Sequence, residues 1–245
     1  QSDTASGSHS FIGGGFGNLA AAGGSFIGSG SSNRTIAGAT DATIGGGAYN
    51  YASGYRSTIA GGESDTATGS IATVGGGFRD TASGNGATVG GGRGNVASGA
   101  TATVAGGRRN VASGNFAAIG GGYQDTATGE YSVIAGGVNN SVWANQSGII
   151  GGEQNAIFGT RSFIGVGLRD TVTGNLSVIA GGLDNRVTAD GAVIGGGQEN
   201  LASAIYATVA GGLRDTASGN GATVGGGRGN VASGFGATVA GGRRN

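Results

Sequence analysis

Residues 87–107, "ATVGGGRGNVASGATATVAGG", contain the same sequence pattern twice, at a spacing of 15 residues. Val89 and Val104 hold equivalent places, each directly before a run of glycine or alanine. From this anchor outward, an Ile or Val recurs sixteen times between residues 12 and 239. Every step is 15 residues except the one from Ile27 to Ile44, which is 17. Such periodicity has to be interpreted before any single motif.

The repeat unit is [AS]-x-[IV]-[GA]-G-G-x-x-[ND]-x-[AVI]-[ST]-G-x-x, with two residues inserted near 34–40. A period of 15 is too short for a pair of helices, and 61 glycines in 245 residues disfavour helices altogether. Each unit holds two short strand signals, such as 95–99 and 102–106, bounded by turn residues. We therefore predict an all-β parallel β-solenoid, or β-roll, of about sixteen coils. Residues 1–245 are expected to form a single continuous repeat array.

Stacking in register assigns each position of the unit to a column. Residues of an extended strand alternate between faces, so the anchor and the Ala or Ser two before it should face the interior together. The Asn or Asp six residues after each anchor is expected at a turn, with left-handed backbone and stacked side-chain amides. Glycines are expected at corners where φ is positive or two backbones approach closely. The Ser or Thr of the second strand should face solvent.

The residue directly before each anchor forms a further column that carries no charge in any coil. A strand without charge on either face is best explained as covered on both faces, and one thin coil can cover only one of them. We therefore expect this column to pack against other copies of the chain. Its predicted packing residues are Phe11, Phe26, Thr88, Thr103, Val133, Phe163, Val178 and Val193.

Composition argues against several functions. The formal net charge of +0 gives no electrostatic basis for binding nucleic acid or a membrane surface. The single histidine, His9, offers neither a catalytic triad nor a metal-ligand cluster, and there is no cysteine. The "GGG" runs lack the Lys-Ser/Thr of a phosphate-binding loop. We expect no enzyme activity, no metal and no cofactor.

One region departs from the repeat and is a candidate contact surface. Trp143 and Phe158 replace the usual Ser or Thr on adjacent coils, and Phe116 and Tyr131 occupy a turn column nearby. Exposed aromatic residues are enriched at recognition sites, so these four residues form a candidate site for a glycan or protein partner. The favoured alternative is local repacking, because the core residues of the same coils are also larger than usual.

Arginines gather in the two residues before the Asn or Asp column, as at Arg93, Arg108 and Arg109. Such a cluster could recognise an acidic partner, although solvated turns are the favoured interpretation. Residues 78–99 recur almost letter for letter at 213–234, an offset of nine units. That duplication is typical of a spacer that varies in length rather than of an active site.

The run from Thr88 to Gly137 resembles the head repeats of trimeric autotransporter adhesins, the YadA-like β-roll. The resemblance lies in an inner strand of the type Ser132–Gly136 and an outer strand of the type Val96–Gly99. It implies a left-handed roll, three identical chains around one axis, and a segment of a longer fibrous protein. It further implies an extracellular or bacterial surface location, or a phage fibre tip, with anchoring in the outer membrane through regions outside this segment. The implied partners are a host or neighbouring cell-surface protein or glycan. The repeat here is slightly longer than is usual in that family.

Two alternatives stay open. The chain could be a subunit of a self-assembling extracellular filament. It could also be a monomeric ice-binding solenoid, since threonine ladders on flat β-faces can match ice, and Thr58, Thr73, Thr88 and Thr103 form such a column. The substitutions at Ala118, Val133 and Phe163 interrupt that ladder.

Overall fold

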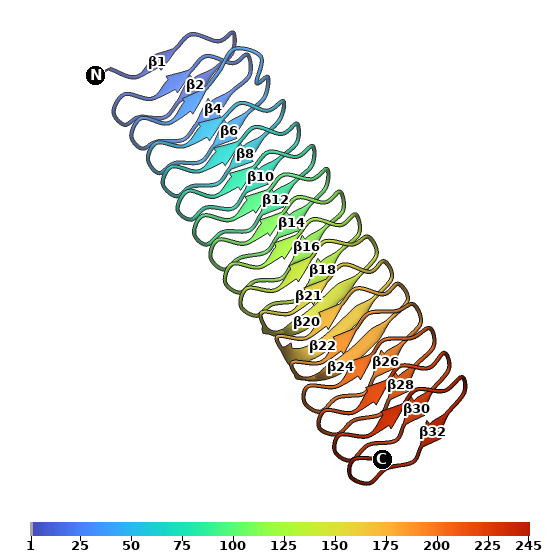
Figure 1. Cartoon of the computed structure of the whole chain (residues 1–245). Helices are drawn as coiled ribbons and strands as arrows, with labels where there is room; N and C mark the ends of the chain where they lie inside the picture. Colours follow the sequence, from blue (N-terminus) through green and yellow to red (C-terminus); the bar gives the residue numbers. More distant parts are fainter. Residues whose placement is uncertain (1) are drawn as a thin grey trace. The chain divides into compact units, whose positions relative to one another are not determined.

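The computed structural model describes residues 2–245 and confirms the parallel β-solenoid of sixteen coils (Figure 1). Each coil contributes one short strand to sheet A and one to sheet B, and residues 2–245 contain no helix. The chain divides into two compact units, residues 1–124 and 125–245, each with eight strands of either sheet.

The strands of unit 1 stack in chain order within each sheet. Sheet A of this unit contains β1 (Thr4–Ala5), β3 (Leu19–Ala20), β5 (Arg34–Thr35), β7 (Tyr51–Ala52), β9 (Thr66–Ala67), β11 (Thr81–Ala82), β13 (Val96–Ala97) and β15 (Val111–Ala112). Sheet B contains β2 (Phe11–Ile12), β4 (Phe26–Ile27), β6 (Thr43–Ile44), β8 (Thr58–Ile59), β10 (Thr73–Val74), β12 (Thr88–Val89), β14 (Thr103–Val104) and β16 (Ala118–Ile119).

Unit 2 repeats the arrangement. Sheet A of this unit contains β17 (Thr126–Ala127), β19 (Ser141–Val142), β21 (Ala156–Ile157), β23 (Thr171–Val172), β25 (Arg186–Val187), β27 (Leu201–Ala202), β29 (Thr216–Ala217) and β31 (Val231–Ala232). Sheet B contains β18 (Val133–Ile134), β20 (Gly148–Glu153), β22 (Phe163–Leu168), β24 (Val178–Leu183), β26 (Val193–Ile194), β28 (Thr208–Val209), β30 (Thr223–Val224) and β32 (Thr238–Val239).

Register follows the sequence period. Val89 of β12 pairs with Val104 of β14, and Ala97 of β13 pairs with Ala112 of β15. The longer step is absorbed in a turn, because Thr35 of β5 pairs with Ala52 of β7 although 17 residues separate them. The pairing of β3 with β5 keeps the ordinary spacing, so the two extra residues lie in the turn 36–42, between β5 and β6.

The core is a thin stack of columns between the two sheets. The anchor Ile or Val, the Ala or Ser two before it and the Ala or Val of sheet A are buried in almost every coil. Burying one such aliphatic side chain contributes about 1.5–3 kcal/mol. Buried serines bond locally, as when the Ser132 hydroxyl donates to the Gly129 carbonyl at 2.6 Å. A 15-residue coil therefore encloses its apolar residues without any large side chain.

The turns correct one prediction. The backbone is left-handed at the residue before the Asn or Asp, such as Tyr49 (φ 58°) or Arg109 (φ 57°), and at the residue three before the anchor, such as Phe116 (φ 58°). The Asn or Asp itself is not left-handed. The corner glycine is the third of each run: Gly92 has φ 112°, and a Cβ there would overlap the Gly107 carbonyl oxygen. Glycine is needed at this corner for both reasons.

Candidate functional site

The outward face of sheet B is uncharged along both units. It carries the residue before each anchor and the residue after it, and neither column contains a charged side chain in any coil. Of the predicted packing residues, Phe11 (54% exposed), Phe26, Val133, Phe163 and Val193 are exposed in the single chain. Thr88, Thr103 and Val178 are half-buried. The structure therefore directs the whole predicted packing column away from the core. Contact with further copies stays a prediction.

This face is not flat in unit 2. Gly148 occupies the outward column between Val133 and Phe163, and its missing side chain leaves an apolar hollow of about 560 Å³. Tyr131 and Ile150, both about half exposed, also line the hollow. A bulky apolar side chain of a partner would fill it. In unit 1, the parallel rings of Phe11 and Phe26 stack with centroids 5.4 Å apart.

The predicted aromatic step lies on the opposite face. Trp143 and Phe158 follow β19 and β21 on the outward side of sheet A, and they are 52% and 53% exposed. Their rings are parallel within 3°, with centroids 6.4 Å apart. Phe116 and Tyr131 are exposed as well, but both are left-handed turn residues and do not belong to this face. The four candidates therefore divide between a sheet face and a turn.

The Asn column is a buried hydrogen-bonded ladder. Asn95 is fully buried, and its Nδ2 donates to the Gly91 carbonyl at 3.0 Å and the Gly107 carbonyl at 2.9 Å. Its Oδ1 accepts the backbone N–H of Asn110 in the next coil at 3.0 Å. Every polar atom of the side chain is thus satisfied, as buried amides require. The sequence predicted the stacking but not this burial.

Five coils carry Asp in this ladder: Asp65, Asp80, Asp125, Asp170 and Asp215. Their Oδ1 accepts the backbone N–H of the next coil, as the Oδ1 of Asn does; Asp80 Oδ1, for example, accepts the N–H of Asn95 at 2.7 Å. Oδ2 is buried without a hydrogen-bond partner in all five. It lies beside the corner glycine, where Asn places its donating Nδ2, so it faces acceptors rather than donors.

The environment of Asp65, Asp80, Asp125 and Asp170 favours the neutral form of their carboxyls. Burial raises the pKa of Asp65 to about 6, against an opposing hydrogen bond from the Asp80 N–H, and the charge of Asp80 raises it further. Burial likewise raises the pKa of Asp80, Asp125 and Asp170. A protonated Oδ2 could donate to the carbonyls that Asn bonds, and an ionised one could not.

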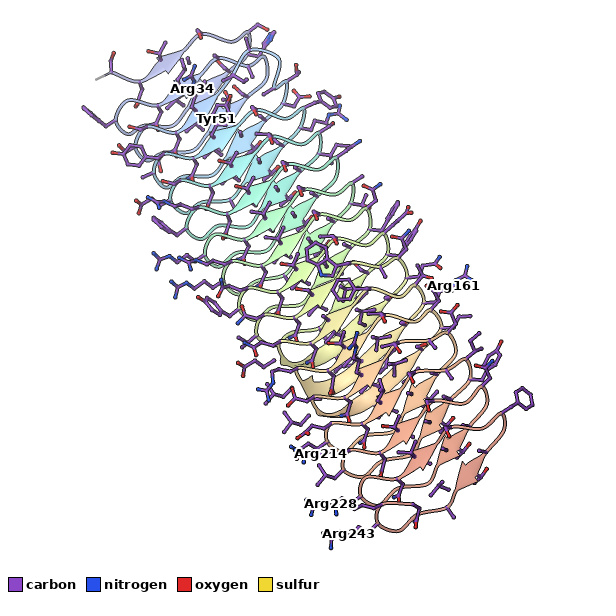
Figure 2. All side chains as sticks on the ribbon, viewed as in Figure 1. Arg34, Tyr51, Arg161, Arg214, Arg228 and Arg243 are labelled. Carbon is purple, nitrogen blue, oxygen red and sulfur yellow. The ribbon has the colours of Figure 1, made fainter. Side chains whose placement is uncertain are left out.

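The turns that lead from sheet B to sheet A carry most of the arginines. In unit 2, Figure 2 shows Arg214, Arg228 and Arg243 along one edge and Arg161 on the opposite edge. Some of these arginines have acidic partners on the preceding or following coil. Arg214 Nε lies 2.6 Å from a Glu199 carboxylate oxygen, and Arg169 Nε lies 2.7 Å from Asp184. Each guanidinium lowers the pKa of its carboxylate.

The remaining candidates are plain surface features. His9 is exposed and left-handed, with φ 58°. Within residues 2–245, no three His, Asp or Glu side chains come together as they would around a metal ion. The same residues include no helix long and apolar enough to cross a membrane.

No protein-family model matches this chain, and no curated protein sequence matches it either. The class of protein is therefore defined by the fold and the faces just described. The chain is a parallel β-solenoid repeat protein, with one uncharged sheet face, a buried Asn/Asp ladder and arginine-bearing turns.

Proposed function

We propose that this chain is a structural and adhesive segment of an extracellular fibre, in which three identical copies pack through the outward face of sheet B. The observation that carries the proposal is the absence of charge from that face in all sixteen coils. The exposed apolar side chains on this face, Phe11, Phe26, Val133, Phe163 and Val193, are of the kind that marks interaction sites. The resemblance to the head repeats of trimeric autotransporter adhesins supports a left-handed trimer at a bacterial surface or on a phage fibre.

Light scattering after size exclusion tests the trimer. The wild-type chain should elute with three times the chain mass, and Val193→Arg should reduce it to the monomer. An arginine at this position would bury a charge in each of the three contacts. Thr188→Arg adds the same charge on the outward side of sheet A and should leave the trimer intact. A monomeric wild type, or equal dissociation of both variants, would refute packing through sheet B.

The adhesive role depends on the face that such a trimer leaves open. Trp143 and Phe158 are half-exposed on that face, and their neighbours in the same column are Ser or Thr. The double variant Trp143→Ser/Phe158→Ser restores the repeat and should weaken the attachment of protein-coated beads to cells about tenfold. Leu176→Thr removes another exposed apolar residue from a turn of the same unit and serves as the control. Equal attachment by all three proteins would exclude the aromatic step as the contact.

A further inference from the structure

Positive charge is concentrated on one turn of unit 1, and the equivalent turn of unit 2 carries four arginines as well, Arg214, Arg228, Arg243 and Arg244. Residues 66–124 contain four arginines, Arg79, Arg93, Arg108 and Arg109, and a single acid, Asp80. All four arginines are exposed, whereas Asp80 is fully buried in the ladder. In the part of the chain that the structure describes, residues 2–245, the ion pairs involve other arginines. We name these four residues the arginine ridge.

The ridge is a regular array. Parallel bridges join Phe78 to Arg93, Arg93 to Arg108 and Arg108 to Tyr123, so these residues form one column. Neighbours in such a column are about 4.8 Å apart. Arg79 and Arg109 lie beside this column, both with left-handed backbone. The positive charges therefore run in two rows, with Arg93 and Arg108 on adjacent coils and Arg79 and Arg109 two coils apart.

Aromatic rings hold three of the guanidinium groups. The Cζ atoms of Arg79 and Arg93 lie 4.8 and 5.3 Å from the centroid of the Phe78 ring, and Arg108 lies 5.6 Å from that of Tyr123. Cation–π contact restrains a long side chain while leaving its N–H donors free for a ligand. Both rings of the ridge are thus already in contact with guanidinium groups, so a nucleobase would have to compete with arginine in order to stack on them.

The chain contains its own comparison for the ridge. Residues 213–234 repeat residues 78–99 with Leu213 in place of Phe78. In that copy, Arg214 is paired with Glu199, whereas Ser64 occupies the equivalent place before Arg79. Unit 1 therefore has the aromatic support that Leu213 cannot give, and within residues 2–245 no ion pair joins Arg79 to the exposed Glu63 one coil earlier. Its guanidinium groups remain available to an anion from outside.

We propose that the arginine ridge binds a linear acidic polysaccharide bearing sulfate or carboxylate groups. Guanidinium donates paired hydrogen bonds to such oxyanions, and the bonds are stronger than those between neutral groups. Cations spread over three successive coils suit an extended polymer that carries several anions along its length. Because both rings of the ridge already contact arginine, a polysaccharide is favoured over a nucleic acid. The ridge lies on a turn outside the sheet B face, so the proposal does not depend on the proposed trimer.

Binding of the full chain to immobilised dextran sulfate, measured by biolayer interferometry over a range of salt concentrations, tests the proposal. Arg93→Gln/Arg108→Gln should weaken binding about tenfold or more and flatten its salt dependence, because two charged contacts are lost. Arg228→Gln/Arg243→Gln, at the equivalent places of unit 2 beside Leu213 instead of Phe78, should weaken binding less. Arg34→Gln/Arg186→Gln removes the same charge from the outward side of sheet A and should change affinity less than about twofold. Neutral dextran should not bind. All substituted side chains are exposed, so thermal unfolding should confirm that the fold is kept.

Phe78→Leu is the second test, since it installs the residue that the duplicated block carries at 213. It should weaken binding by roughly two- to fivefold through loss of the cation–π support alone. The proposal is overturned if wild type ignores dextran sulfate at low salt, or if either of the other double variants loses as much affinity as Arg93→Gln/Arg108→Gln. It is also overturned if a single-stranded oligonucleotide binds the same arginines more tightly than dextran sulfate does.

Discussion

Replacing Asp65 with asparagine should stabilise the protein at neutral pH and change its stability little near pH 3. Asn50, one coil earlier, shows what the substitution supplies. Its Nδ2 donates to the carbonyls of Gly46 and Gly62 at 2.9 and 3.0 Å. At Asp65 the equivalent atom is an oxygen without a hydrogen-bond partner. Asparagine would therefore provide a donor where the carboxylate has none.

The sign and size of this change in stability follow from the pKa of Asp65. Burial raises the pKa of Asp65 from 3.8 to about 6, so the folded state holds its proton more tightly than the unfolded state. The contribution of this group is full below pH about 4, falls as the pH rises to about 6, and then stays low. A difference of roughly two pKa units corresponds to about 3 kcal/mol. Asp65→Asn should therefore gain about 2–3 kcal/mol at pH 7, and little at pH 3.

Urea denaturation of both proteins at pH 3, 5 and 7 measures this difference. The control is Glu130→Gln, which removes an exposed carboxylate and should shift stability little at any of the three values. An equal gain at pH 3 and pH 7 would attribute the effect to packing instead of ionisation. No gain at pH 7 would refute the assignment of Oδ2 to a site that needs a donor.

Three further outcomes follow from the same columns. Gly92→Ala should lower the free energy of unfolding by about 2–4 kcal/mol in urea denaturation, because its Cβ would overlap the Gly107 carbonyl at a positive φ. The control Gly106→Ala should lower it far less, because the nearest atom to its Cβ is 4.0 Å away. Asn95→Asp should lose about 1–3 kcal/mol at pH 7 and recover much of it near pH 4, by the same denaturation assay. The chain should show no thermal hysteresis in ice-growth measurements, because Ala118 interrupts the threonine column of sheet B; a clear hysteresis would instead support the ice-binding alternative.

Fold and register could be predicted from the sequence because the period and the side-chain alternation constrain the same residues. Each inward position tolerates only small or branched apolar residues, so columns such as Val89 and Val104 carry a clear signal. The exposure of Trp143 and Phe158 is in line with their place in the outward Ser/Thr column. What these residues bind stays a prediction, because the repeat pattern reflects packing within the coil and contains no information about a ligand.

The left-handed turn residue could not be predicted because its column shows no preference for glycine. That column includes Tyr49, Arg109 and Gln124, with φ between 56° and 58°. The hydrogen bonds between coils fix the backbone there: the Arg109 N–H donates to the Arg93 carbonyl at 2.9 Å. Any side chain that points to solvent is accepted once these bonds compensate the strain. The Asn or Asp that follows was the more obvious candidate and serves a different role, inside the ladder.

The sequence alone does not reveal the arginine ridge, because net charge hides the separation of buried acids from exposed arginines. A formal net charge of +0 counts every acid as a surface charge, yet five of the 13 acids belong to the buried ladder, while all 13 arginines are exposed. A carboxyl inside the coil takes the place of an asparagine side chain in the ladder. Because it is buried, it cannot pair with an arginine on the solvent-exposed turn. In a solenoid, charge balance is therefore a property of each column. The turns of residues 66–124 and 213–245 are therefore cationic in a chain whose total charge is zero, and the proposed acidic polymer would be attracted by this local positive field.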